Sequence, residues 1–133
     1  MTNSSATDFR LELSPSLHAV SVAREFVTTH SDSLPPDVIE TAVLLVSELV
    51  TNAVKHGRPT IRLHVSLAPP LIGVSVHDDG DVLPSTQVSL PVATATSGRG
   101  LVIIERLSSH WGVIPSDPNP GKTVWFQLDA PDN

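Results

Sequence analysis

Two polar side chains interrupt the apolar face of one predicted helix. Residues 37–57 read "DVIETAVLLVSELVTNAVKHG", in which Glu48 and Asn52 lie four residues apart. Residues four apart are neighbours on a helix surface, so both side chains point the same way, at the border of the apolar stripe. A carboxylate can orient or deprotonate a nucleophile, and an amide oxygen can bind Mg²⁺. The pair is therefore a candidate site, although a solvated helix face would give the same pattern.

A second candidate is the glycine-rich start of another predicted helix. The segment "SGRGLVIIERL" contains Gly98, Arg99, Gly100 and Leu101. Glycines let a ligand approach the backbone closely, and the free N–H groups at a helix start attract phosphate. Arg99 adds a positive charge that can bind a phosphate oxygen. A simple helix-opening turn would also explain this segment.

Two further segments carry polar residues beside glycines. Asp78 and Gly80 follow the apolar run "LIGVSVH", and Gly121 and Thr123 open "GKTVWFQL". A polar turn at a strand end would account for the first segment alone. The second is not a P-loop, because Ser116 stands where that motif needs a glycine and a strand follows in place of a helix.

Hydrophobic periodicity places these residues on regular elements. It predicts strands at residues 8–15, 59–67, 71–78, 111–116 and 122–130. Helices are expected at 15–30, 36–56 and 98–110, the second with a capping box of Asp37 and Glu40. Residues 79–97 form a long loop, which is typical of a functional lid. The order β-α-α-β-β-loop-α-β-β predicts an α/β (α+β) fold, a two-layer sandwich of a mixed β-sheet with helices on one face.

Composition limits the kinds of protein that this chain can be. Its 133 residues suit one domain, here residues 8–130 after a flexible tail at 1–7. Because aromatic residues make up only 4%, the core must be mostly aliphatic, with Trp111 and Trp125 inside it. A net charge of -6 argues against direct nucleic-acid binding. The absence of cysteine excludes disulfides and thiolate chemistry, and no signal or membrane-spanning run is present, so a cytoplasmic protein is expected.

Taken in order, the four segments resemble the sequence boxes of the GHKL ATPases. This superfamily includes gyrase, Hsp90, histidine kinases and MutL, and "SELVTNAVKHG" resembles its N-box. The chain looks most similar to the small anti-sigma-factor serine kinases and their stand-alone actinobacterial relatives. The resemblance covers about residues 9–129 and implies a Bergerat ATP-binding fold.

The resemblance also implies roles for the candidate residues. Glu48 matches the general base and Asn52 the Mg²⁺ ligand, while Gly98, Arg99, Gly100 and Leu101 match the phosphate-binding box.

The other two boxes match the adenine end of the site. Asp78 would accept a hydrogen bond from the adenine amino group, and Gly80 would let the base approach the backbone. Thr123 would lie beside Asp78. Val82 departs from the family pattern, which has a second glycine there, and this affects the expected shape of the lid.

The implied function is that of a regulatory kinase. ATP with Mg²⁺ would supply the γ-phosphoryl group for a protein serine or threonine. A sigma factor, an anti-sigma antagonist or both would be the partners, and a homodimer is compatible with this function. A nucleotide-dependent module that sequesters a regulator without catalysis is the main alternative, followed by a histidine-kinase catalytic domain and a structural domain that binds no nucleotide.

Overall fold

The computed structural model describes residues 6–80, 96–116 and 120–129, with side chains from residue 102 onward in the third helix. The elements within these ranges are β1 (Thr7–Leu13), α1 (His18–His30), α2 (Pro36–His56), β2 (Ile61–Ala68), β3 (Leu71–Asp78), α3 (Thr96–Leu107), β4 (His110–Pro115) and β5 (Lys122–Asp129). Their order is the predicted one. Most of the expected loop, residues 81–95, lies outside the described residues. Thr7, which the prediction placed in the N-terminal tail, belongs to β1.

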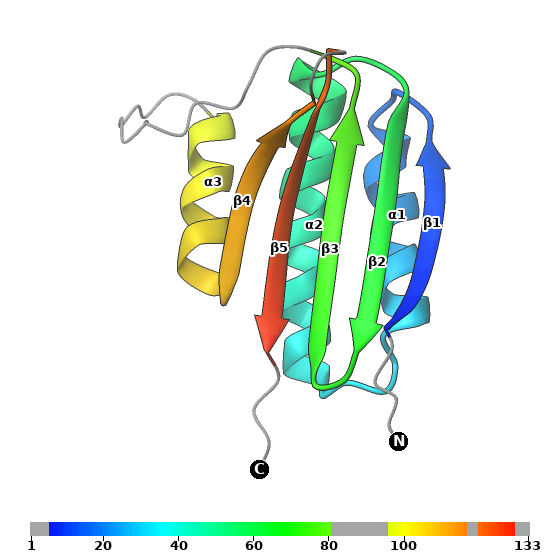
Figure 1. Cartoon of the computed structure of the whole chain (residues 1–133), viewed down its shortest axis with the longest axis vertical. Helices are drawn as coiled ribbons and strands as arrows, with labels where there is room; N and C mark the ends of the chain where they lie inside the picture. The colour runs from blue at the N-terminus through cyan, green and yellow to red at the C-terminus, as the bar shows by residue number, and fades with distance from the viewer. Residues whose placement is uncertain (1–5, 81–95, 117–119, 130–133) are drawn as a thin grey trace.

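The strands form one sheet in the order β1-β2-β3-β5-β4. Every neighbouring pair in it is antiparallel, so the prediction of a mixed sheet is wrong. The reason is visible in Figure 1: β3 and β4, which α3 connects, run in the same direction, but β5 lies between them and runs the other way. The parallel pair that a β-α-β connection suggests is therefore never adjacent.

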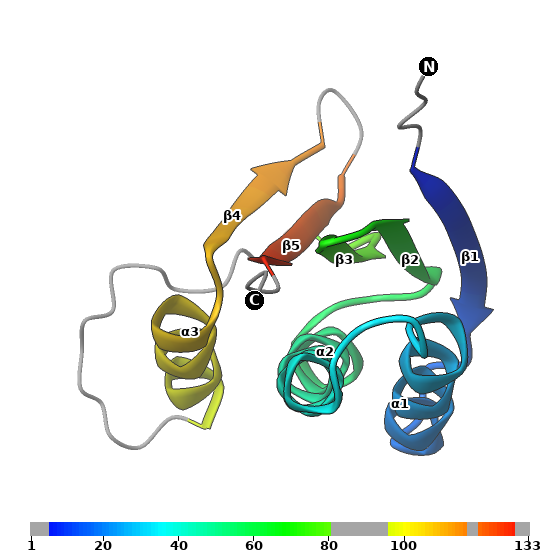
Figure 2. The ribbon, with the colours of Figure 1, turned by 90° about the horizontal axis from the view of Figure 1, so that it is seen from below.

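All three helices cover the same face of the sheet, so the predicted two-layer sandwich is confirmed (Figure 2). α2 lies between α1 and α3 in this layer. Alternate strand residues point into the space between the layers, where they meet the apolar stripe of α2. The largest apolar side chains closed to solvent are Phe126, Leu45, Ile61, Leu63, Ile72 and Ile104. Mainly aliphatic packing is what a chain with few aromatic residues needs.

The two tryptophans lie on opposite faces of the sheet. Trp111 is partly buried and packs against the core, as predicted. Trp125 is not a core residue, because Val124 and Phe126 take the buried positions on either side of it in β5. Its ring lies instead over Gly112 of β4, where an added Cβ would come within 2.9 Å of Trp125 Nε1. The face of the sheet opposite the helices therefore carries an aromatic side chain.

The helix ends differ in detail from the prediction. α1 begins at His18, whereas Pro15 was expected to open it. The predicted capping box of α2 does not form, because Pro35 is the N-cap residue and Asp37 already lies inside the first turn. The Asp37 carboxylate instead accepts a hydrogen bond from its neighbour Val38 N at 3.0 Å. None of the described helices is both long and apolar enough to cross a membrane.

Candidate functional site

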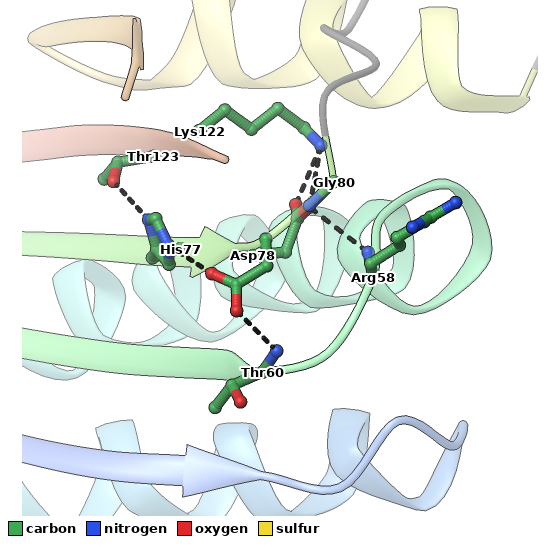
Figure 3. Close-up of polar contacts among 8 residues, drawn as sticks. Arg58, Thr60, His77, Asp78, Gly80, Lys122 and Thr123 are labelled. Atoms are coloured by element: carbon green, nitrogen blue, oxygen red, sulfur yellow. Dashed lines mark hydrogen bonds and ion pairs between the residues drawn. The ribbon is translucent and has the colours of Figure 1, made fainter. Parts of the chain in front are cut away.

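Asp78 ends β3 as a buried carboxylate with fixed hydrogen-bond partners (Figure 3). Its side chain is only 3% exposed. Oδ1 accepts hydrogen bonds from Gly80 N at 2.8 Å and from Arg58 N at 3.3 Å. The Lys122 ammonium lies 2.8 Å from Oδ2 and 3.0 Å from Oδ1. The carboxylate is thus held in one orientation at the end of a strand, beside the end of α2.

Glycine backbone lies against this carboxylate on two sides. A Cβ added at Gly57 would collide with Cγ of Asp78 and both of its oxygens. One added at Gly80 would lie 3.0 Å from Asp78 Oδ1 and 3.2 Å from Arg58 N. Glycine at both positions therefore lets the C-terminal end of α2 and the segment after β3 close around Asp78. The expected close backbone approach at Gly80 is present, although what it approaches here is the carboxylate itself.

Thr123 does not lie beside Asp78, and this part of the prediction is wrong. In the β3–β5 ladder Thr123 pairs with His77, and Lys122 pairs with Asp78. Because successive strand residues face opposite ways, Thr123 Oγ1 lies on the helix-free face, 3.1 Å from His77 Nδ1. Lys122 occupies the place expected for Thr123. The alternation in "KTVWFQL", which puts Lys122 on the same face as Val124 and Phe126, was the signal that could have identified it.

Asp79, which follows Asp78 in the sequence, forms hydrogen bonds to the segment between α2 and β2. Its Oδ2 accepts a hydrogen bond from Thr60 N at 3.1 Å, and its Oδ1 lies 3.0 Å from His77 Nε2. The Thr60 N–H bond, followed by the His77 bond, lowers the pKa of Asp79. Asp79 N also donates to Arg58 O at 2.9 Å. Asp79 therefore holds the backbone of residues 58–60 in place. The N–H of Arg58 in this segment in turn contacts Asp78.

Glu48 and Asn52 lie one turn apart in α2, at the edge of its buried apolar stripe. Both side chains are half-buried, and neither makes a hydrogen bond to any other described residue. The predicted placement of both residues on one helix face is therefore present.

The three polar side chains form a row along α2. The helix ends beside Asp78, because its C-cap Gly57 contacts the Asp78 carboxylate. At 1.5 Å per residue, Asn52 lies about 7.5 Å and Glu48 about 13.5 Å from Gly57 along the helix axis. An acceptor, an amide and a carboxylate thus follow one another in the direction of the helix axis. This order suits an elongated ligand with a base at the Asp78 end.

The glycine-rich box lies in the first turns of α3. This helix begins at Thr96, two residues earlier than predicted, so Gly98 and Gly100 are already helical. Figure 1 shows that α3 begins at the end of the molecule where β3 and α2 end. The first turn of a helix carries free N–H groups. The side chains of Arg99 and Leu101 lie outside the described part of the structure, and phosphate binding by Gly98, Arg99, Gly100 and Leu101 stays a prediction.

Comparisons with known proteins agree with this arrangement. The family model for the histidine kinase-like ATPase domain matches residues 13–128. The structure of the RsbU and RsbW domains of Rv1364c from Mycobacterium tuberculosis is similar, with a TM-score of 0.71 and 21% identity over 96% of this chain and 33% of that one. The histidine kinase domain of the blue-light activated kinase EL346 from Erythrobacter litoralis has a TM-score of 0.55 and 18% identity, covering 85% of this chain and 58% of that chain. No match was found among curated protein sequences.

The two similar structures are longer than this chain, which spans a third of the first and somewhat over half of the second. At these identities they establish the fold, and the expected Bergerat architecture is confirmed. The family model covers β2 through most of β5 as well as both long helices, and so includes every candidate residue. This chain therefore belongs to the histidine kinase-like ATPase domain family of the GHKL superfamily.

Proposed function

We propose that the chain binds ATP with its adenine at Asp78. The observation that carries this proposal is the buried Asp78 carboxylate, fixed by backbone N–H groups and enclosed by Gly57 and Gly80. A carboxylate accepts hydrogen bonds and donates none, so it favours a base edge that presents an amino group. Adenine has such a group, whereas guanine presents a carbonyl at the same position. Membership of an ATPase domain family supports the same ligand.

Asn52 is the residue that would hold Mg²⁺ beside the phosphates. Its amide oxygen is a hard donor, and it has no hydrogen-bond partner among the described residues. The described residues contain no cluster of three or more histidines and carboxylates that could enclose a metal. A site of one protein oxygen completed by phosphates and water suits Mg²⁺, which usually keeps several waters and binds few protein groups. Bound there, Mg²⁺ would neutralise charge on the phosphates.

Glu48 would accept the proton of a protein hydroxyl during phosphoryl transfer. In this step the serine or threonine oxygen forms a bond to the γ-phosphorus, and the bond from that phosphorus to ADP breaks. The hydroxyl proton goes to the Glu48 carboxylate. Because such reactions depend mainly on positioning and charge stabilisation, one carboxylate about 6 Å beyond Asn52 along α2 can suffice. Residues Gly98, Arg99, Gly100 and Leu101 would hold the phosphates from the α3 side.

The partner would be another protein of the cytoplasm. Similarity in fold to a structure that contains an RsbW domain supports a regulator of this type. We place the chain among the anti-sigma-factor-like kinases, with a sigma factor, a phosphorylatable antagonist or both as partners.

Titration calorimetry with Mg·ATP, Mg·ADP and Mg·GTP tests the nucleotide part of this function. Adenine nucleotides should bind and GTP should not. Incubation with labelled ATP and a candidate antagonist then tests transfer, which should place phosphate on serine or threonine. Binding without transfer would favour the non-catalytic module, which Val82 in place of the family glycine also supports. If no nucleotide binds, the proposal fails.

A further inference from the structure

We propose that Lys122 is the positioning residue of the adenine site, which acts by orienting Asp78. This inference rests on the proposed function, since it assigns the device that prepares Asp78 for the adenine amino group. Lys122 was expected neither from composition nor from the family boxes. Its side chain is 6% exposed, and it is one of the few charged residues buried within the described part of the chain.

The hydrogen bonds of Asp78 show which oxygen is available to a base. Oδ1 already accepts from Gly80 N, Arg58 N and Lys122 Nζ. Oδ2 accepts from Lys122 Nζ alone among the described residues. A carboxylate oxygen has about two lone-pair sites, so Oδ1 is saturated and Oδ2 retains one site. A single amino group needs one such site.

Lys122 fixes the direction of the site that remains at Oδ2. It is the only described residue that bonds both oxygens, at 2.8 and 3.0 Å, and so fixes the rotation of the carboxylate plane. Without it, both remaining donors, Gly80 N and Arg58 N, would be at Oδ1, and nothing among the described residues would hold Oδ2. The ammonium also compensates a negative charge that is closed to water, which an uncharged side chain could not do.

The backbone brings Lys122 to this place. Lys122 pairs directly with Asp78 in the antiparallel ladder, which puts both side chains on the helix-facing side. Gly121 before it has a φ of 136°, a conformation that favours glycine, and it lies where an added Cβ would be 3.1 Å from Asp78 O. Thr123 after it points to the other face and contacts His77. Thr123 is therefore a matched control: it lies one residue away in the same strand, and its hydroxyl bonds His77 and not Asp78.

The test is a thermodynamic cycle that combines substitution of Lys122 with removal of the 6-amino group from the ligand. Calorimetry would measure the affinity of the full chain for Mg·ADP and for the Mg²⁺ complex of purine riboside 5′-diphosphate, in which hydrogen replaces the 6-amino group. We expect Lys122→Met to weaken ADP by about tenfold or more, as for loss of a hydrogen bond to a charged group. The analogue should change by less than about threefold. Lys122→Arg should restore part of the loss, and Thr123→Val should behave like the parent.

Each outcome decides the matter. An equal loss for both ligands would mean that Lys122 only supports the fold, and tighter ADP binding would mean that its ammonium competes with the base; either overturns the proposal. If Lys122→Met does not give a folded chain by circular dichroism, Lys122→Gln, which keeps a donor and loses the charge, replaces it in the same cycle. Failure of the parent chain to bind ADP appears in the first titration and refutes the proposed function together with this inference. If the parent binds ADP and Lys122→Met binds both ligands with the affinities of the parent, this inference alone is refuted.

Discussion

Two adjacent aspartates at the end of β3 have different roles because they lie on opposite faces of the sheet. Asp78 points toward the helices and is buried with Lys122. Asp79 points away, contacts His77 and holds the backbone at Thr60. Strand alternation alone decides this division. An exchange of one carboxylate for the other cannot be neutral, since one is paired with a buried ammonium and the other holds the backbone at Thr60.

Replacement of Asp78 by asparagine should affect both binding and stability. The variant Asp78→Asn removes the counter-charge of a buried ammonium, which typically costs about 3 kcal/mol or more. We expect this loss in the free energy of unfolding, measured with urea, together with at least a tenfold weaker affinity for Mg·ADP.

The double variant Asp78→Asn with Lys122→Met separates the two effects. It removes the unpaired charge, so stability should partly recover while ADP affinity does not. Parent-like ADP binding by Asp78→Asn would remove Asp78 from the adenine role.

Gly57 should tolerate no side chain, for a purely steric reason. Its φ of -98° is open to any residue, but a Cβ there would collide with the Asp78 carboxylate. We expect Gly57→Ala to lower the free energy of unfolding by about 1–3 kcal/mol, as overpacking does. The control is Gly73→Ala in β3, where the nearest atom to an added Cβ is 3.8 Å away. Equal stability of the two variants in urea would contradict this view of Gly57.

The stability supplied by Asp79 should depend on pH. The Thr60 N–H and His77 lower the pKa of Asp79 below its ordinary value of 3.8. A carboxyl with a lower pKa in the folded state stabilises the fold above the unfolded-state value and loses this effect as pH falls through the folded value. We expect Asp79→Asn to be less stable than the parent at pH 6, with a difference that shrinks below about pH 4.

Urea unfolding at pH 6, 5, 4 and 3 would measure this difference. Asp129→Asn is the control, because Asp129 is exposed at the end of β5 and its carboxylate has no hydrogen bond to the described residues. A difference between Asp79→Asn and the parent that stays constant over this range would show that the Asp79 charge contributes nothing.

At the scale of elements, helices and strands could largely be predicted because their patterns are local. The bounds of α2 and β3 agree with the prediction residue for residue, since Pro36, Gly57 and the alternation of β3 mark them clearly. The sheet pairing could not be predicted, because the insertion of β5 between β3 and β4 is a long-range choice. The same holds for the site: the shared face of Glu48 and Asn52 is local, whereas the contact of Lys122 with Asp78 depends on strand register.

The row of side chains along α2 should separate binding from transfer. We expect Glu48→Ala to keep ADP affinity within about threefold and to lower phosphoryl transfer by about 10²–10⁴-fold, the usual contribution of a general base. Asn52→Ala should instead weaken the Mg²⁺-dependent part of nucleotide binding.

Ser47→Ala is the control for this pair of variants, because Ser47 lies on the α1 side of α2 and donates a hydrogen bond to Val43 O. Calorimetry with and without Mg²⁺, and transfer of labelled phosphate, would measure the two effects. Undiminished transfer by Glu48→Ala would remove the general base from the proposal.

At the scale of the whole molecule, the proposed transfer to a protein hydroxyl sets a geometric condition on the partner. The candidate residues lie in or beside the helix layer, and Glu48 of α2 is only half-buried. A protein substrate of the proposed kinase would therefore approach from the helix side and bring a serine or threonine to Glu48. The helix-free face of the sheet, with Trp125 and His77, lies on the other side of the sheet from the helix layer that contains Glu48.

Partner binding should consequently depend on the bound nucleotide. We expect immobilised chain with Mg·ADP or Mg·ATP to recover a small antagonist-type protein or a sigma factor from host extract, in amounts that differ between the two nucleotides. The variant Asp78→Asn with Lys122→Met provides the control, because it should fold and yet lose this dependence. Mass spectrometry of the recovered antagonist after incubation with ATP should find phosphate on serine or threonine and none on histidine. Recovery of neither class, with no effect of nucleotide on any partner, would reject the anti-sigma function even for a chain that binds ATP.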